Sequence, residues 1–271
     1  MFITIINDCN DQNALGRQAT RVSALFNSCV NTVGINNDIE AAGNLIDMLD
    51  AVGDEEGYIL VNVAPRSSNW NFSIDQNGNG KHWENGTPFA SFKYKNITVI
   101  STIDGYTLSL VKKLNLVSSI NLYDIPTVTQ FLNNKGLIDI GLKNHIDKTQ
   151  FRSFDFSPRV AYYLEQNIDL PSTSLDVQKI KDIPNVVWWI DNFGNCKTSL
   201  LQNDLTDINE EISTRFGKIR FYERLKDVPD NSVALITGSS GIEDSRFIEL
   251  VVQGHSADKK LGVKLGDEIL M

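Results

Sequence analysis

Two kinds of apolar pattern alternate in the N-terminal part, and this alternation constrains the fold more than any other feature. Phe2–Ile6 and Gly57–Val63 are short, nearly continuous apolar runs, as expected of strands that are buried on both faces. Between them, apolar residues recur at helical spacing over Leu15–Cys29 and Ile39–Leu49, the second run behind Asp38 as the expected N-cap. Strands that alternate with helices predict a mostly parallel sheet in an N-terminal α/β sandwich domain.

Open parallel sheets bind ligands outside the carboxyl ends of their strands. This rule indicates two candidate site loops, Asn7–Asn10 and Ala64–Ser67. Asp8 in the first loop is also typical of a turn or a helix cap, and Arg66 in the second of a solvated cation, so the residues alone leave both interpretations open. Farther along, Trp70–Phe92 predicts antiparallel hairpins at the sheet edge.

A different pattern begins near the last third of the chain. Pro171–Asp182 is rich in Ser, Asp and Lys, which predicts a linker that we place at residues 173–184. From residue 185 onward, short apolar runs are separated by turn residues, which predicts a small antiparallel β-barrel. The expected domains are therefore residues 1–172, an α/β domain, and residues 185–271, a smaller β-barrel domain.

Composition excludes several classes of partner. A formal net charge of −9 argues against nucleic acid, because binders of a phosphate backbone need clustered Lys and Arg. Neither a signal peptide nor an apolar run of membrane length is visible, so no membrane partner is expected. Cys9, Cys29 and Cys196 are odd in number and lack CxxC spacing, which favours a reducing, cytoplasmic setting. The sequence has no HExxH, GxGxxG or phosphate-loop spacing, so it predicts no metal and no cofactor.

The turn Asp191-Asn192-Phe193-Gly194-Asn195 follows an apolar run and precedes a second short strand. This arrangement predicts a hairpin. A plain turn needs only the Gly and one Asn, so the additional Asp191, Phe193 and second Asn also favour a ligand-binding turn. On spacing alone the two interpretations are equally supported.

Thr149–Pro158 places an Arg and an Asp among three Phe residues. The segment fits either an active-site loop or packed aromatic residues with charges at the surface. Arg152 beside Ser153 is chemically suited to hold a small anion, because both side chains donate hydrogen bonds, although a solvated pair is the alternative.

Four motifs follow one another in the C-terminal part: Ile190–Asn195 followed by Thr198, Gly238–Gly241, Phe247–Leu250 and Leu261–Asp267. In order and spacing, apart from an apparent insertion at Ile242–Ser245, they resemble the S-adenosylmethionine hydroxide adenosyltransferase and fluorinase-chlorinase family. At the other end, Asn7–Asn10 stands where the family has Thr-Asp-Phe-Gly. Only Asp8 is kept there, and the family's second acidic position falls on Asn13.

The resemblance implies a nucleoside-binding N-terminal domain, a C-terminal barrel and a homotrimer with its site at the subunit interface. It also implies that S-adenosylmethionine is the substrate or ligand and that a nucleophile displaces methionine at ribose C5′. By this resemblance Asp8 would accept the ribose hydroxyls and Asp191 would hold the methionine amino group. The implied substrate-binding residues are Asp8, Asn10, Asn13, Asp191, Phe193, Asn195, Ser239, Ser240, Phe247, Gln253 and Gly254, with Gln253 in place of an Asn.

The departures from the family lie where its chemistry is expected. Ala64–Ser67 replaces the Asp-Pro-Gly-Val-Gly motif of the hydrolases, so their water-orienting Asp is absent. The catalytic His of the family would fall near Phe151–Ser153, whereas the nearest His is His145. A loop that covers the ligand in relatives is missing between Ile35 and Ile39. The candidates for a rearranged anion or water site are Arg66, Arg152, Ser153 and Asp155.

Two functions follow as hypotheses. The first is an S-adenosylmethionine hydrolase that forms adenosine and methionine with water or hydroxide, which we favour over a halogenase. The second is a protein that binds S-adenosylmethionine or adenosine without turnover, having lost the catalytic residues.

Overall fold

The computed structural model describes residues 1–64, 72–205 and 211–271. The chain divides into two compact units, Met1–Lys181 and Asp182–Met271. The boundary between them falls inside the segment 173–184 that the sequence predicts as a linker.

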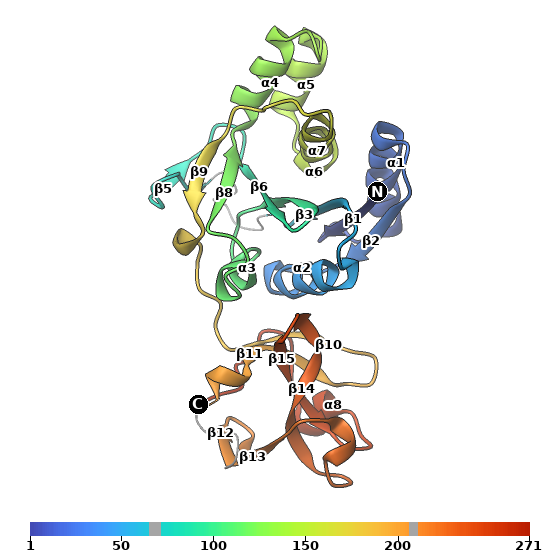
Figure 1. Ribbon diagram of the computed structural model, residues 1–271, viewed down its shortest axis with the longest axis vertical. Helices are drawn as coiled ribbons and strands as arrows, with labels where there is room; N and C mark the ends of the chain where they lie inside the picture. The colour runs from blue at the N-terminus through green and yellow to red at the C-terminus, as the bar shows by residue number, and fades with distance from the viewer. Residues whose placement is uncertain (65–71, 206–210) are drawn as a thin grey trace. The chain divides into compact units, whose positions relative to one another are not determined.

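The first unit is built on a seven-stranded sheet with the order β2-β1-β3-β7-β6-β8-β9 (Figure 1). Its strands are β1 (Phe2–Asn7), β2 (Val30–Gly34), β3 (Gly57–Asn62), β6 (Phe89–Tyr94), β7 (Ile97–Thr102), β8 (Ser119–Tyr123) and β9 (Thr173–Asp176). β2, β1, β3 and β7 are parallel, β6 is antiparallel to both β7 and β8, and β9 is antiparallel to β8. The sheet is therefore mixed, and the predicted parallel pairing holds for its first four strands.

Local turn chemistry explains the antiparallel part. β6 and β7 are joined by two residues, of which Lys95 has a positive φ of 50°, and so short a connection pairs strands antiparallel. β6 also lies in the middle of the sheet, whereas the hairpins of this segment were expected at its edge. Among the described residues of this segment, β4 (Phe72–Ile74) and β5 (Gly80–His82) pair as a separate two-stranded hairpin.

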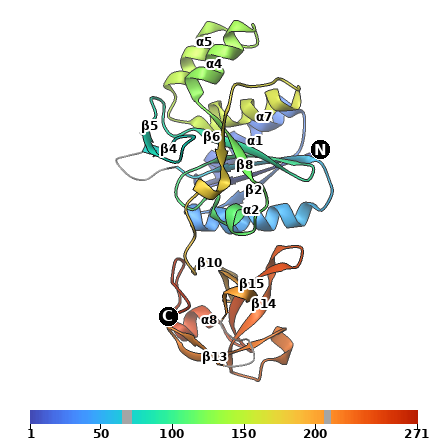
Figure 2. The same cartoon turned by 60° about the vertical axis from the view of Figure 1, so that its left-hand side comes forward.

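Helices cover both faces of the sheet (Figure 2). The helices are α1 (Gln12–Phe26), α2 (Asp38–Val52), α3 (Ser109–Lys113), α4 (Ile125–Asn134), α5 (Ile140–Lys148), α6 (Arg152–Asp155) and α7 (Ser157–Glu165). α2 contacts α3, β1 and β3, while α1, α6 and α7 pack together and α7 contacts β3 and β7. On the α7 side, Val22, Phe156 and Val160 pack against Ile3 and Leu60 in one apolar cluster.

The helix starts show how short-range polar contacts set the boundaries. Asp11 caps α1 by accepting hydrogen bonds from the N–H groups of Asn13 and Ala14. Asn37, rather than the predicted Asp38, caps α2, because the extended backbone of Asn37 lets its side chain accept from the Glu40 N–H at 2.9 Å. Asp38 already belongs to the helix.

The predicted linker contains structure. Thr173–Asp176 within it forms β9, which pairs with β8 and buries Leu175 completely. A single 3-10 turn, η1 (Val177–Lys179), follows. The polar composition of this segment fits an edge strand, which needs only one apolar side chain directed at the core.

The second unit is a six-stranded sheet with the order β10-β11-β15-β14-β13-β12. Its strands are β10 (Val187–Ile190), β11 (Cys196–Leu201), β12 (Glu211–Thr214), β13 (Gly217–Tyr222), β14 (Val233–Ile242) and β15 (Ser245–Val252). The short helices are η2 (Gln202–Asp204), η3 (Leu225–Asp227) and α8 (Ala257–Leu261). Val187, Leu200, Leu235, Ile248 and Leu250 pack in the core of this unit.

The predicted closed antiparallel barrel is not confirmed. Over the described residues the ladder order has two ends. Residues 266–270 contact both ends through isolated bridges, Val186–Glu268 and Thr214–Leu270, and through single main-chain hydrogen bonds rather than through a strand. The pairing is also not wholly antiparallel, because β13 and β14 are parallel. The connection between them, which includes η3, is long enough to return the chain to the same end of the sheet.

Candidate functional site

The carboxyl ends of β1 and β3 are joined by polar side chains. Asn7 and Asp8 are 0% and 6% exposed. Asn62 Nδ2 donates to Asn7 Oδ1 at 2.9 Å, and the Ala64 N–H donates to Asp8 Oδ2 at 2.9 Å. Asp11 rather than Asp8 caps α1, and the Asp8 carboxylate instead accepts from the main chain at Ala64, two residues after β3.

The remaining N-terminal candidates follow β1. Asn10 Nδ2 donates to the Ile35 carbonyl at 2.9 Å and to Asn36 Oδ1 at 3.2 Å, so it ties the first loop to the segment before α2. Asn13 is exposed in the first turn of α1. The structure therefore brings Asp8 and Asn10 to this edge of the sheet, while Asn13 lies on the helix surface.

A buried charged cluster continues the same edge toward β7 and β6, linked to β3 by a hydrogen bond from the Val63 N–H to Thr102 Oγ1 at 3.2 Å. Asp104 follows β7 and Thr87 precedes the antiparallel β6, so both lie at the carboxyl edge. Thr87 Oγ1 donates to Asp104 Oδ2 at 2.7 Å. Arg152, 8% exposed, donates to the Thr87 carbonyl.

Burial controls the charges in this cluster, which we name the Arg152 cluster (Thr87, Phe89, Asp104 and Arg152). It raises the pKa of Asp104 to about 6, while the Thr87 hydrogen bond and the charge of Arg152 lower the pKa and the charge of Asp38 raises it. Burial lowers the pKa of Arg152 and Asp104 opposes that effect, so the guanidinium stays charged at neutral pH. The Arg152 guanidinium carbon also lies 5.6 Å from the centre of the Phe89 ring. Arg152 is therefore not the solvated cation of the alternative interpretation.

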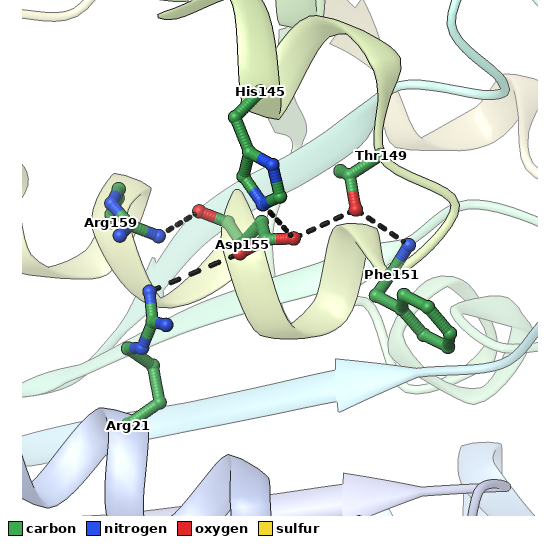
Figure 3. A network of polar contacts seen from close by, with 6 residues as sticks. All are labelled: Arg21, His145, Thr149, Phe151, Asp155 and Arg159. Atoms are coloured by element: carbon green, nitrogen blue, oxygen red, sulfur yellow. Dashed lines mark hydrogen bonds and ion pairs between the residues drawn. The ribbon is translucent and has the colours of Figure 1, made fainter. Parts of the chain in front are cut away.

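Asp155 belongs to a different network (Figure 3). It does so although it lies one helical turn from Arg152. Its Oδ2 accepts from Thr149 Oγ1 at 2.7 Å and lies 3.2 Å from His145 Nε2, and its Oδ1 lies 3.9 Å from an Arg21 nitrogen. Arg159 donates to the Asp155 main-chain carbonyl. Asp155 thus joins α1, α5, α6 and α7, whereas Arg152 faces the sheet.

The other two predicted catalytic candidates are Ser153 and Arg66. Ser153 is half-buried on α6. Arg66 lies outside the described residues. At the position where the family's His was expected, Phe151 is 63% exposed.

The Asp191–Asn195 turn in the second unit is held together by its own polar groups. Asp191 Oδ1 accepts from the N–H groups of Phe193 and Asn195 at 2.8 and 2.9 Å. Asp191 Oδ2 accepts from Asn195 Nδ2 at 3.1 Å. Gly194 has a φ of +85°, and its carbonyl accepts from the first N–H groups of α8. The predicted hairpin is therefore confirmed, and the turn displays Phe193 with 72% of its surface exposed.

A second polar group in this unit lies across three adjacent strands. Lys197 of β11 is paired with Glu249 of β15, and its ammonium donates to Ser240 Oγ at 2.6 Å. The Ser239 N–H donates to Glu249 Oε1 at 3.1 Å. Burial raises the pKa of Glu249, and the Ser239 hydrogen bond and Lys197 oppose that shift. Ser239 and Ser240 thus lie beside one buried carboxylate and one ammonium.

Of the last three predicted contacts, Phe247 lies within β15, whereas Gln253 and Gly254 follow its end. Phe247 is completely buried, with its ring 6.4 Å from that of Trp188, so its side chain belongs to the core. Gln253 is half-buried and Gly254 is exposed, and both follow β15. The main chain of Gln253 pairs with Asn231 and Ser232.

Sequence reasoning missed four residues that the structure places beside the candidates: Thr87, Asp104, Lys197 and Glu249. Asp104 had a usable signal, since it follows the apolar run of β7 just as Asp8 follows that of β1. Thr87 had none, because its place depends on the pairing of β6 in the middle of the sheet.

Two absences apply to the part of the chain that the structure describes. No group of three or more His, Cys, Asp and Glu side chains is placed to hold a metal ion. No helix within residues 1–64, 72–205 and 211–271 has both the length and the apolar character needed to cross a membrane.

The fold and the turn define a protein that joins an α/β sheet unit to a small β unit with a preformed polar hairpin turn. Residues 185–270 match the model of the SAM hydroxide adenosyltransferase C-terminal domain family, where SAM is S-adenosylmethionine. Over these residues the chain is similar to this family, which confirms the resemblance predicted from the C-terminal motifs.

Solved structures extend the likeness to the whole chain. An uncharacterized conserved protein from Thermotoga maritima is similar with a TM-score of 0.65 and 17% identity, covering 98% of each chain. A conserved hypothetical protein from Thermus thermophilus is similar with a TM-score of 0.60 and 16% identity, covering 99% of each chain. At this identity the likeness concerns the fold alone. The chain matches no curated protein.

Proposed function

We propose that the protein is an S-adenosylmethionine hydrolase that displaces methionine at ribose C5′ with water or hydroxide. The observation that carries the proposal is the family match over residues 185–270, which includes the Asp191–Asn195 turn. In the reaction, a water oxygen forms a bond to C5′ while the C5′–S bond breaks. Its electron pair stays on sulfur, so methionine leaves as a neutral thioether, and one water proton is released. Adenosine is the other product.

The N-terminal edge supports the proposal through Asp8. A carboxylate accepts about four hydrogen bonds, which suits it to a ribose diol as well as to the Ala64 N–H. Its place after a parallel strand is where open sheets bind ligands. The bonds to Asn62 and Ala64 hold the Asp8 carboxylate in one orientation before a ligand arrives.

The Arg152 cluster supports a role for Asp104 in the proton step. Because its pKa is raised to about 6, the carboxyl is mostly ionised at neutral pH, yet it is a stronger base than an ordinary Asp. Arg152 then acts by fixing the loop at Thr87 and by keeping positive charge at this edge. Asp155 has the smaller role of holding α6 in place.

The turn in the C-terminal unit supports the methionine end of the proposal. Asp191 presents a carboxylate of fixed orientation, which suits an ammonium group, and Phe193 presents an exposed ring beside it. Lys197, Ser239 and Ser240 bring donors of the kind that a carboxylate needs. Each of these contacts with the methionine end is part of the proposal.

The second candidate function is binding without turnover. It is favoured because the two residues whose charges best suit the ligand already have hydrogen-bond partners within the protein. Arg152 donates to the Thr87 carbonyl, and both carboxylate oxygens of Asp191 accept bonds within the turn. A site of this kind can hold a ligand while lacking a group that orients the attacking water.

A chromatographic assay with S-adenosylmethionine separates the two functions. The hydrolase proposal expects adenosine and methionine in equal amounts, and formation of no product above the uncatalysed rate would contradict it. Asp8→Asn should lower kcat/KM by at least about tenfold, the effect of one charged hydrogen bond. Asp11→Asn is the matched control, because Asp11 lies three residues away and only caps α1.

Calorimetry tests the binding function. S-adenosylmethionine or adenosine should bind to the full chain, and Asp191→Ala should abolish S-adenosylmethionine binding while circular dichroism remains unchanged. Binding of intact S-adenosylmethionine without product favours the second function, and no measurable binding of either ligand excludes it.

A homotrimer is part of the same proposal, and sedimentation velocity measures it directly. A monomer at assay concentration would contradict that part. The cytoplasmic location stays a prediction.

A further inference from the structure

The first unit contains a polar cavity of about 450 Å³ that opens near the amino ends of β3 and β7. The candidate site described above lies at the other ends of these strands. Cavities of roughly 300–1,000 Å³ are typical of small-molecule sites. Its lining includes Tyr58, Ser91, Asn121 and Tyr123 of the sheet and Glu165 at the end of α7.

Strand register explains why polar side chains share this surface. Tyr58 is paired with Thr98, and Thr98 with Lys93, so these three form one row across β3, β7 and β6. Ser91, two residues from Lys93, is paired with Asn121 of β8. Side chains two residues apart point to the same face, so the rows lie on one side of the sheet. This side of the sheet faces α7, because Tyr58 packs in the same apolar cluster as Val160 of α7.

Tyr58 and Glu165 form the first polar pair in the cavity. Tyr58 is 5% exposed, and its hydroxyl donates to Glu165 Oε2 at 2.8 Å. Burial and the Glu165 carboxylate raise the pKa of Tyr58, so the phenol stays protonated at all physiological pH values. The cavity therefore holds a carboxylate of fixed position beside a neutral hydroxyl group.

Ser91 and Tyr123 form the second pair. Their oxygens are 2.8 Å apart, and the residues are 4% and 3% exposed. Burial raises the pKa of Tyr123 as well. Each hydroxyl of this pair can both donate and accept, so the pair can take up one more bond of either kind.

The charges of the lining narrow the ligand class. Glu56 and Glu165 are acidic and Lys93 is basic, so the formal charge of the lining is −2 + 1 = −1. A net negative lining disfavours phosphates and carboxylates. The many hydroxyl and amide groups disfavour an apolar ligand, since their burial under it would leave them without partners.

We propose that this cavity is a binding site for a small neutral polyhydroxylated molecule, of the size of a pentose. Tyr58 and Glu165 bind one pair of its hydroxyls, and Ser91 and Tyr123 bind another. The site lies within the first unit and does not depend on the proposed function.

Saturation-transfer NMR with D-xylose tests the site on the full-length protein. Wild type should give a saturable signal that saturating adenosine leaves unchanged, whether or not the protein hydrolyses S-adenosylmethionine. Tyr58→Phe and Ser91→Ala should each weaken xylose binding about fivefold, the effect of one lost hydrogen bond. Tyr94→Phe is the matched control, because Tyr94 lies on β6 with Ser91 but outside the cavity lining. The affinity of this variant for xylose should equal that of wild type.

Three results would overturn the proposal. The first is no saturable xylose signal in a wild-type protein whose circular dichroism and melting are normal. The second is equal affinity in wild type and both cavity variants. The third is displacement of xylose by inorganic phosphate at similar concentration, which would show that the site does not select a neutral ligand over an anion.

Discussion

The Asp191–Asn195 turn and the Arg152 cluster are both fixed arrangements of polar groups, but they are assembled differently. In the turn, the longest of the side-chain bonds within the motif spans four residues. In the cluster, the bond from Arg152 reaches a carbonyl 65 residues earlier in the chain. A local assembly depends on a few neighbouring residues, whereas a non-local one depends on the whole sheet. The two should therefore respond differently to substitution.

Replacing Arg152 should have the largest effect. Arg152→Met removes a buried guanidinium and its hydrogen bond to the Thr87 carbonyl, which should lower the unfolding free energy by about 3 kcal/mol. Urea denaturation followed by circular dichroism measures the change. Arg224→Met is the control, because the Arg224–Asp227 pair is exposed, and it should leave the midpoint unchanged. Equal midpoints for both variants would show that the cluster contributes no more than a surface pair.

The pH dependence of stability tests the half-buried carboxyl of Asp104 in the same cluster. The pKa of Asp104 is raised from 3.8 to about 6, so the folded state binds this proton more tightly than the unfolded state. The contribution of Asp104 to stability is then fully present below about pH 4 and is lost as pH rises through about 6. About two pKa units correspond to roughly 3 kcal/mol.

Asp104→Asn isolates this effect. The unfolding free energy of wild type relative to Asp104→Asn should fall by about 3 kcal/mol between pH 4 and pH 7. Urea titrations of both proteins at several pH values give the difference. A constant difference over this range would contradict a raised pKa of Asp104.

The local turn should respond to a single methyl group. Gly194→Ala puts a side chain at a φ of +85°, with its Cβ 2.4 Å from Ser256 Oγ and from Asp258 Oδ1. Gly254→Ala has a similar φ of +79° but nothing within 4 Å of the added Cβ. The left-handed backbone alone costs about 1–2 kcal/mol in either variant. Because Gly194→Ala also has a steric clash, its loss of unfolding free energy should exceed that of Gly254→Ala by roughly another 1 kcal/mol or more. Thermal unfolding of the two variants measures the difference, and equal losses would mean that the contact with α8 relaxes freely.

The smallest effect is expected at Asp191. Asp191→Asn keeps one oxygen that can accept from the Phe193 and Asn195 N–H groups, and it loses the charge and the second acceptor. The loss of unfolding free energy should be about 0.5–1 kcal/mol, well below that of Arg152→Met. Differential scanning calorimetry can measure it, and a loss as large as that of Gly194→Ala would show that the turn needs the charge.

The same contrast explains what the sequence could predict. The strands β1 and β3, the helix periods and the turn at Asp191–Asn195 depend on nearby residues, and each was predicted at nearly its observed place. The family motifs were recognised for the same reason, since they lie in short segments. The N-cap of α2 differed by one residue, because Asn and Asp are both good caps and only the backbone of Asn37 separates them.

What could not be predicted depends on distant pairing. Nothing near Thr87 in the sequence indicates that β6 enters the middle of the sheet beside β7, so the acceptor for Arg152 was invisible. Arg152 and Asp155 are close in sequence and were considered together, yet one faces the sheet and the other faces α1 and α5. The parallel pairing of β13 and β14 is equally non-local, because short strands of either direction have the same composition.

Phe193 gives the rigid turn an additional physical meaning. Its main chain is held by the Asp191 carboxylate, while 72% of the residue surface remains in water. A molecule that covers the ring gains the free energy of removing apolar surface from water, about 25 cal/mol per Å². The backbone beneath the ring is already ordered, so little further conformational entropy is lost on contact. The turn therefore keeps an aromatic contact surface ready at a low entropic cost of association.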